Sequence, residues 1–262
     1  MEDKFLLITC AGQATRFKES GGNTHKSIFS IDGDICKSPL GIMCQYAKFI
    51  ERTPVIVTGF MADEIDDALS ELSSKLEIQI YSTYNEHYSD LGSNESLICG
   101  LQFIMQNFDY DDYDIMFAEG DLMVDFDTFR EIANSQNCVV TTNGNSIINM
   151  NKAVVVYQNI HGTYKWAYDP AHKSVSITDA VWLAESGQIW KFKIDDICLY
   201  NILDGLIKSD RKDTNLNMIY KIFATLSEFS DIDIKTFKQW FNVNTVNDYK
   251  LAIQSLYEKY EN

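Results

Sequence analysis

Short apolar runs alternate with helical stretches through the first half of the chain, and this alternation restricts the fold more than any other feature. Strand-like runs are predicted at 5–11, 54–59, 77–82 and 113–118, and helices at 39–51, 62–76 and 95–106. A repeated strand–helix order is typical of a mostly parallel sheet that carries helices on both faces. The sequence therefore predicts a three-layer, Rossmann-like α/β fold.

From about residue 134 the pattern changes to short β-branched stretches separated by polar turns, which indicates a mixed or antiparallel extension of the sheet. Strands are expected at 138–142, 153–157, 174–178 and 240–243, and helices at 197–207, 217–226 and 246–260. No linker, repeat or low-complexity segment interrupts the 262 residues. We therefore expect one domain over 1–262, with a first half of about 1–130 and a second of about 131–262.

The net charge of −16 makes nucleic acids and anionic membranes unfavourable partners, because both carry negative charge. Six cysteines are scattered without a C-x-x-C pair, which favours reduced thiols in a cytoplasmic protein. The N-terminal apolar run is too short for a signal sequence or a membrane span. Any anion that binds this chain must be held by a local group of donors and cations.

Such a group of donors is expected in the segment 9–29, which follows the first predicted strand. Gly12 allows close approach to backbone N–H groups, and Arg16 and Lys26 add two cations. Oriented backbone donors supported by cations suit a triphosphate. A mobile surface loop with ordinary cations is the alternative for this segment taken alone. The two common phosphate motifs, G-x-x-x-x-G-K-S/T and G-x-G-x-x-G, are absent.

A second polar segment, Glu119-Gly120-Asp121, follows the strand predicted at 113–118. The carboxyl ends of parallel strands meet at one edge of a sheet, so this segment is expected near residues 9–29. An aspartate there suits Mg²⁺ held against phosphate oxygens, and a solvated acidic turn is the alternative. Asn244, which follows a late strand, offers a carbonyl oxygen to the same ion, whereas Thr245 is explained by helix capping alone.

These segments resemble, in order, the motifs of the nucleotidyltransferases. The resemblance is carried by A-G-x-x-x-R-F at 11–17, Lys26, Gly-Asp at 120–121 and N-V-N-T-x-x-D at 242–248. It implies a single α/β domain that joins a nucleoside triphosphate to a phosphorylated acceptor and releases pyrophosphate, with nucleotide bound by the first half and acceptor by the second.

Within that group, residues 84–104 are similar to the small phosphocholine-type cytidylyltransferases, through Asn85, Tyr88, Asn94, Ser96 and Leu97. The G-T-A/Q stretch of the sugar enzymes is not evident. The resemblance implies CTP and a small acceptor such as phosphocholine or a phosphorylated amino acid, with a CDP-linked product for capsule or other surface polysaccharide. A sugar-1-phosphate nucleotidyltransferase and a non-catalytic nucleotide-binding homologue remain the alternatives, and an oligomer is compatible with the sequence.

The resemblance also implies roles for individual residues. Arg16 and Lys26 are predicted to be catalytic, and Asp121 and Asn244 to hold Mg²⁺. The predicted nucleotide-binding residues are Ala11, Gly12, Gln13, Ala14, Asn94 and Ser96.

Acceptor contacts are predicted for Lys152, Trp182 and Trp190, because aromatic faces hold quaternary ammonium groups and a lysine binds a carboxylate or phosphate. Ordinary core packing for the tryptophans and a strand-edge position for the lysine are the alternatives.

Three positions depart from the motifs. Ala14 replaces the second glycine, and alanine disfavours positive φ. His25 replaces the proline before the lysine, which we expect to loosen the approach of Lys26. Asn244 replaces a common aspartate and lowers the negative charge expected at the metal. We interpret all three as changes within an active enzyme.

Overall fold

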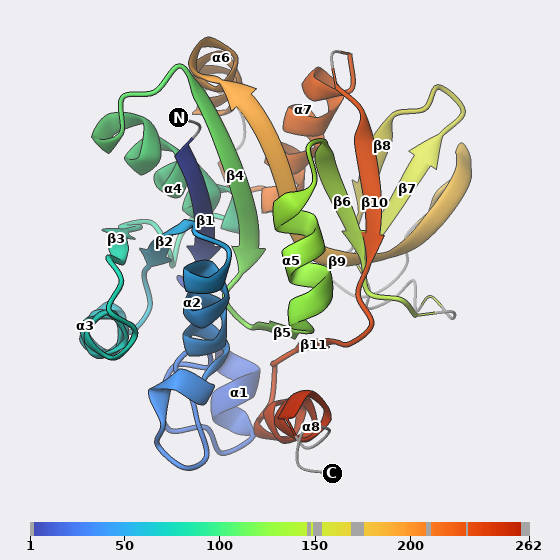
Figure 1. The fold of residues 1–262 in the computed structure, drawn as a ribbon. Coiled ribbons are helices and arrows are strands. Elements are labelled where there is room, and N and C mark those ends of the chain that lie inside the picture. The colour runs from blue at the N-terminus through green and yellow to red at the C-terminus, as the bar shows by residue number, and fades with distance from the viewer. Residues whose placement is uncertain are drawn as a thin grey trace.

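A mixed β-sheet forms the centre of the computed structural model, which describes residues 3–145, 148, 154–168, 176–207, 211–228 and 230–257. The strands of the main path are β1 (Asp3–Thr9), β2 (Thr53–Thr58), β3 (Tyr81–Tyr84), β4 (Asp112–Glu119), β6 (Cys138–Thr142), β9 (Ala180–Asp195) and β10 (Ile232–Thr236). Their order is β10-β6-β9-β4-β1-β2-β3 (Figure 1). The four strands from β4 to β3 are parallel, whereas β9 is antiparallel to both β4 and β6. The predicted mostly parallel sheet is confirmed.

Helices cover both faces of this sheet. The helices of the described residues are α1 (Thr15–Glu19), the short 3-10 helix η1 (Ile35–Lys37), α2 (Pro39–Phe49), α3 (Ala62–Leu76), α4 (Ser93–Asn107), α5 (Phe126–Asn134), α6 (Asp196–Ile207), α7 (Asn215–Leu226) and α8 (Val246–Tyr257), of which α1 and α8 lie beyond the carboxyl ends of the strands (Figure 1). Side chains of α2, α3 and α5 share one buried cluster, and side chains of α4, α6 and α7 share another. The arrangement therefore has three layers, with α2 and α5 in front of the sheet in Figure 1.

The alternation of side chains along β1 explains why both faces are covered. Phe5 and Leu7 belong to the cluster with α4, whereas Leu6 and Ile8 belong to the cluster with α2. All four are at most 1% exposed. Because successive residues of a strand point to opposite faces, a strand that is apolar at every position must be buried on both sides.

The second half of the sheet is extended by smaller strands. Strands β7 (Val155–Asn159) and β8 (Tyr164–Ala167) pair with each other, and β7 also pairs with β9. Strands β5 (Leu122–Val124) and β11 (Trp240–Asn242) form a separate antiparallel pair. Because β5 follows β4 directly in the chain, this pair lies just beyond the carboxyl end of β4.

A third apolar cluster joins the two ends of the chain. Phe17 of α1 packs with Val243 and with Tyr249 of α8, and the three are at most 2% exposed. The carboxyl ends of β1 and β4 point toward α1 and α8 (Figure 1). This packing holds the segment after β11 beside the loop after β1.

The structure corrects two predicted strands. Residues 176–178, in the run expected as a strand at 174–178, lie in no regular element, and the long strand β9 begins at Ala180 instead. Its central residues are polar, so the run does not stand out as one strand in the sequence. Strand β3 begins at Tyr81 rather than residue 77, because Glu77 ends α3 in the left-handed conformation, with φ of 54°.

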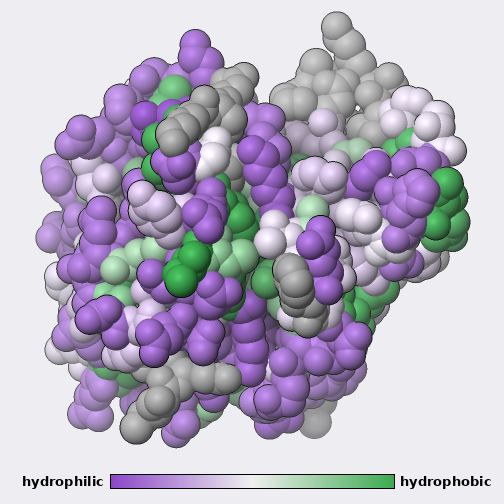
Figure 2. Space-filling model, turned by 90° about the horizontal axis from the view of Figure 1, so that it is seen from above, coloured by the Kyte–Doolittle hydropathy of each residue, from purple (hydrophilic) through white to green (hydrophobic). Residues whose placement is uncertain are grey.

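The face shown in Figure 2 is mostly hydrophilic, and the net charge is −16. Within the described ranges, no helix combines the length and the apolar character that crossing a membrane requires.

Candidate active site

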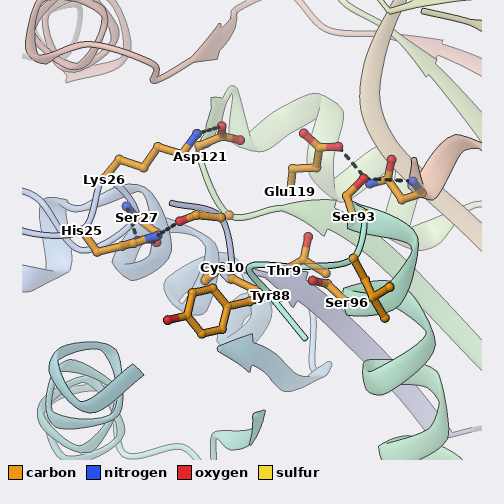
Figure 3. A pocket seen from close by; sticks show the side chains of 16 residues that line it. Thr9, Cys10, His25, Lys26, Ser27, Tyr88, Ser93, Ser96, Glu119 and Asp121 are labelled. Carbon is orange, nitrogen blue, oxygen red and sulfur yellow. Dashed lines mark hydrogen bonds and ion pairs between the residues drawn. The ribbon is translucent and has the colours of Figure 1, made fainter. Parts of the chain in front are cut away.

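A cleft lies at the carboxyl ends of β1 and β4, where the parallel strands of such a sheet bind ligands. It consists of two adjoining cavities of about 280 Å³ each. The first cavity (Figure 3) is lined by the loop after β1, by residues 25–27 and by the start of α4. The second cavity lies toward Arg16, Asn242 and Asn244. Both cavities share Lys26, Ser93, Glu119, Asp121 and Asn215.

An ion pair between Lys26 and Asp121 lies where the two cavities meet. The lysine Nζ is 2.5 Å from Oδ2 of Asp121 (Figure 3). Oδ1 of Asp121 is buried and makes no hydrogen bond within the described residues. Gly120 allows the end of β4 to lie close to the end of β1, because a Cβ there would lie 2.3 Å from Sγ of Cys10 and 2.9 Å from the carbonyl oxygen of Thr9. The junction of the two cavities therefore holds an ion pair with one buried carboxylate oxygen that has no hydrogen-bond partner among the described residues.

Arg16 and Asn244, 228 residues apart in sequence, meet beside this pair. Arg16 donates from Nη2 to the amide oxygen of Asn244 at 2.8 Å. Asn244 in turn donates from Nδ2 to Oδ1 of Asn242 at 2.6 Å. The backbone N–H of Val243 donates to the carbonyl oxygen of Asp121 at 2.8 Å. That bond fixes the segment after β11 against the segment after β4, and so brings Asn244 to the cleft.

A family model described as domain of unknown function DUF6564 matches residues 22–256. The chain belongs to this family. No curated protein matches it.

Solved structures of nucleotidyltransferases share the fold of this DUF6564 chain. The inositol-1-phosphate CTP transferase from T. maritima has a TM-score of 0.64 at 10% identity, over 96% of each chain. The CTP:phosphocholine cytidylyltransferase from Streptococcus pneumoniae has a TM-score of 0.62 at 13% identity, over 96% of this chain and 97% of the other. The UDP-glucose pyrophosphorylase from Acinetobacter baumanii has a TM-score of 0.62 at 13% identity, over 97% and 93%. The expected nucleotidyltransferase fold is thereby confirmed.

The structure brings most of the predicted phosphate-binding residues of the DUF6564 chain to the cleft. Ala11, Gly12 and Lys26 line the first cavity. A Cβ at Gly12 would meet no described protein atom within 4 Å, so the backbone there is open to a ligand. Gln13 and Ala14 also lie in the described chain, but they line neither cavity.

Of the two residues predicted on α4, the structure places only Ser96 at the first cavity, where it accepts a hydrogen bond from Nδ2 of Asn85 at 3.0 Å. Asn94 is completely buried, and neither side-chain polar atom finds a hydrogen-bond partner among the described residues. It lines neither cavity. Helical geometry explains the difference, because residues two apart on a helix face different directions.

The predicted acceptor residues lie elsewhere or outside the described residues. Lys152 is outside them. Trp190 is 0% exposed and stacks on Phe117 with 5.3 Å between ring centroids, so it has no surface with which to contact an acceptor. Trp182 packs edge-on against Tyr164. Neither tryptophan is among the described residues that line the cleft. The burial of Trp190 corrects its predicted contact with an acceptor, whereas the role of the half-buried Trp182 stays a prediction.

Glu119 and Asn215 line the cleft although the sequence assigned them no role. Asn215 Nδ2 donates to Oε1 of Glu119 at 2.9 Å. Burial raises the pKa of Glu119 to about 7, and the negative charge of Asp121 acts in the same direction. The two residues are 96 positions apart. The sequence shows the acidic end of the strand, but no motif around Asn215 indicates that it contacts Glu119.

His25 fixes the loop that carries Lys26, contrary to the expectation that it would loosen it. Its ring is 1% exposed, with Nε2 3.0 Å from the carbonyl oxygen of Gly12 and Nδ1 2.5 Å from Oγ of Ser27. Burial lowers the pKa of His25 to about 4. A carbonyl oxygen only accepts hydrogen bonds, so the neutral ring donates from Nε2 to Gly12 and accepts at Nδ1. The histidine therefore ties Lys26 to the loop after β1.

This environment of His25 predicts a pH-dependent stability. Between about pH 6.5 and pH 4 the unfolded chain binds a proton at His25 that the native chain does not bind. The free energy of unfolding should therefore fall as the pH falls through this window, by up to about 3 kcal/mol for a shift of this size. Chemical denaturation of wild type and His25→Gln across the window measures the effect.

The quantity to compare is the difference in the free energy of unfolding between wild type and His25→Gln at each pH. Both proteins contain Glu119, whose raised pKa makes the free energy of unfolding rise as the pH falls between about 7 and 4.5, opposite to the effect of His25. Wild type should lose stability relative to His25→Gln on acidification. Parallel curves for the two proteins would contradict the neutral, buried histidine.

Ala14 occupies a backbone conformation that favours glycine, with φ of 52° and ψ of 31°. A left-handed alanine costs about 1–2 kcal/mol, which a glycine at this position would not pay. Glycine gives back about 0.4–1 kcal/mol of this stabilisation, because the unfolded chain gains conformational entropy. We therefore expect Ala14→Gly to raise the free energy of unfolding by about 0.5–1 kcal/mol, measured by urea denaturation. Ala224→Gly within α7 is the matched control, and it should lower stability by a similar amount. Equal losses in both variants would show that Ala14 is not strained.

Proposed function

We propose that this chain is a Mg²⁺-dependent nucleotidyltransferase that transfers a cytidylyl group from CTP to a small phosphorylated acceptor and releases pyrophosphate. The observation that carries the proposal is the convergence of Arg16, Lys26, Asp121 and Asn244, which come from four separate segments, on one cleft. Two contacts link them, the Lys26–Asp121 ion pair at 2.5 Å and the Arg16–Asn244 hydrogen bond at 2.8 Å. The fold shared with nucleotidyltransferases supports the same reaction class.

The nucleotide occupies the first cavity in this proposal. Backbone N–H groups near Gly12 and the Lys26 ammonium bind its phosphates, and Arg16 neutralises the leaving pyrophosphate. These cations matter because the chain as a whole, with a net charge of −16, repels a triphosphate. His25 holds the two phosphate-binding segments together through its bond to Gly12.

The chemistry of the donor set fits Mg²⁺. Oδ1 of Asp121 is buried with no hydrogen-bond partner in the described residues, and the amide oxygen of Asn244, which accepts one hydrogen bond from Arg16, keeps a second lone pair. Hard cations of this kind take one or two protein oxygens together with substrate phosphates. When bound, the ion would withdraw charge from the phosphate oxygens.

The reaction needs positioning and charge stabilisation more than proton transfer. An oxygen of the acceptor phosphate forms the new bond to the α-phosphorus while the bond to the β-phosphate oxygen breaks, and pyrophosphate takes the electron pair. The nucleophile is already an anion, so no general base is required. Lys26 and Arg16 hold the reacting groups in line and stabilise charge that moves toward the leaving group.

CTP is favoured by the similarity of residues 84–104 to the phosphocholine-type enzymes. The second cavity, at about 280 Å³, suits a small acceptor and offers it the polar side chains of Gln188 and Asn242. The product in this proposal is a CDP-linked small molecule for surface polysaccharide modification.

Pyrophosphate release from a panel of four NTPs and several acceptors tests the proposal. Phosphocholine, phosphorylated amino acids and 2-aminoethylphosphonate form one arm, and sugar 1-phosphates form the other. Turnover of CTP with an acceptor of the first arm is expected. Turnover with sugar 1-phosphates alone would instead support the sugar-nucleotide reaction, for which the likeness to the UDP-glucose pyrophosphorylase is the favouring observation.

A further inference from the structure

Glu119 lies between the reacting end of the cleft and the start of α4. It is the last residue of β4 and pairs in register with Thr9, the last residue of β1. Figure 3 shows its side chain between the Lys26–Asp121 pair on one side and Ser93 on the other. Only Gly120 separates Glu119 from Asp121 along the chain.

The orientation of this carboxylate is fixed. Asn215, which is 3% exposed, donates from Nδ2 to Oε1 of Glu119 at 2.9 Å. The backbone N–H of Asn215 donates to Oγ of Ser93 at 3.0 Å, which docks the start of α7 on the start of α4. Oε2 of Glu119 makes no hydrogen bond within the described ranges, and Lys26, the nearby cation, is already paired with Asp121. One oxygen is therefore held in place, and the other is available to a ligand.

The first cavity, which Glu119 lines, is rich in hydroxyl groups, and Lys26 is the lysine or arginine that lines it. Thr9, Ser93 and Ser96 line the first cavity with Glu119. In the proposed function the α-phosphate lies at Lys26 and Asp121, and the sugar is the group attached directly to it. A nucleoside that extends from there along the first cavity toward Ser96 must pass Glu119 with its sugar.

Resting on the proposed function, we infer that Glu119 accepts hydrogen bonds from the ribose hydroxyls of the bound nucleotide and selects ribonucleotides over deoxyribonucleotides. A carboxylate accepts from hydroxyl donors with charge-assisted hydrogen bonds, which are about twice as strong as neutral ones. A strand-end carboxylate binds the ribose of dinucleotides in the same way in Rossmann folds. Asn215 is the positioning residue, because it fixes Oε1 and leaves Oε2 for the sugar.

The test compares kcat/KM for CTP, 2′-deoxy-CTP and 3′-deoxy-CTP in wild type, Glu119→Gln and Glu119→Ala. Wild type should prefer CTP over at least one deoxy analogue by about tenfold or more, the range of a hydrogen bond to a charged group. Glu119→Ala should reduce this ratio to within about twofold, and Glu119→Gln should give an intermediate ratio. The ratio is measured within each variant, so partial loss of folded protein does not change it. Glu86→Gln, at an exposed glutamate outside the cleft, is the matched control and should keep the wild-type ratio.

Asn215→Leu separates positioning from general structure. Removal of the amide should lower the CTP to deoxy-CTP ratio, whereas a merely structural role would lower kcat/KM for all three nucleotides equally and would overturn the positioning role.

Failure of the inference is distinguishable from failure of the proposed function. If wild type uses CTP and Glu119→Ala keeps the full preference for ribose, the inference is overturned and the proposed reaction stands. The inference is equally overturned if Glu119→Ala raises only the KM of the acceptor, because the carboxylate then contacts the acceptor. If wild type releases pyrophosphate from no NTP, the proposed function itself fails.

Discussion

Replacement of Asp121 by alanine is expected to lower the rate of pyrophosphate release by at least about a hundredfold, which corresponds to about 2.7 kcal/mol of transition-state stabilisation. The carboxylate is the only acidic side chain that contacts Lys26 among the described ion pairs, at 2.5 Å, and its buried Oδ1, which has no hydrogen-bond partner in the described residues, is the oxygen proposed for Mg²⁺. Its loss removes the proposed metal ligand and leaves Lys26 without its partner. Steady-state pyrophosphate release with CTP and the acceptor identified by the panel measures the effect.

Asp127→Ala is the matched control for this experiment. Its side chain is 58% exposed on α5, where it pairs with Arg130 outside the cleft, and the substitution should leave the rate unchanged. A rate close to wild type in Asp121→Ala would contradict the proposed role. If wild type itself binds CTP by calorimetry but turns over no acceptor, the chain is a nucleotide-binding homologue without catalysis.

The sequence predicted the elements that have a clear apolar period. Helix α3 and strand β6 have the bounds expected from the sequence, at Ala62–Leu76 and Cys138–Thr142. Helix α5 was not predicted, because it follows directly on the acidic segment that the sequence analysis interprets as part of a metal site. Strand β10 was not predicted either, since its polar and apolar residues alternate only over five positions. A pattern this short is not distinctive without the neighbouring strand.

The residues of the candidate site likewise fall into those that the sequence predicts and those that it does not. Arg16, Lys26 and Asp121 were predicted because each follows a strand in a short motif, and all three line the cleft. Their chemical roles remain predictions, as do the single domain and the acceptor. The contact of Glu119 with Asn215 was not predictable, because it depends on how α7 docks on α4. His25 was misjudged because the sequence shows the loss of a proline but not the carbonyl oxygen that the new ring binds.

The largest expected effect on stability comes from Asp114, near the amino end of β4. Its carboxylate is 2.9 Å from Nη2 of Arg52 and 3.3 Å from Nζ of Lys191, and each of the three side chains is at most 3% exposed. Loss of one member of a buried ionic group costs about 3–5 kcal/mol, because the remaining charges lose the carboxylate that neutralises them. Asp114→Ala should therefore lower the free energy of unfolding by about this amount in urea denaturation.

A second substitution identifies the cause of that loss. Lys191→Met removes one of the two buried cations, so Asp114→Ala should cost less in the Lys191→Met background than in wild type. Asp127→Asn, at an exposed ion pair, should change stability by less than about 1 kcal/mol. Additive losses in the double variant would show that the three charges do not act as one group.

The buried charges around Asp114 and the proposed site lie at opposite ends of strand β4. Asp114 and Glu119 both belong to β4, and five residues of strand span about 17 Å. Folded Asp114→Ala protein should therefore keep its kcat and its preference among nucleotides, measured well below its unfolding midpoint. A fall in kcat of the folded variant would mean that the buried charges at the amino end of β4 also set the geometry of the cleft at its carboxyl end.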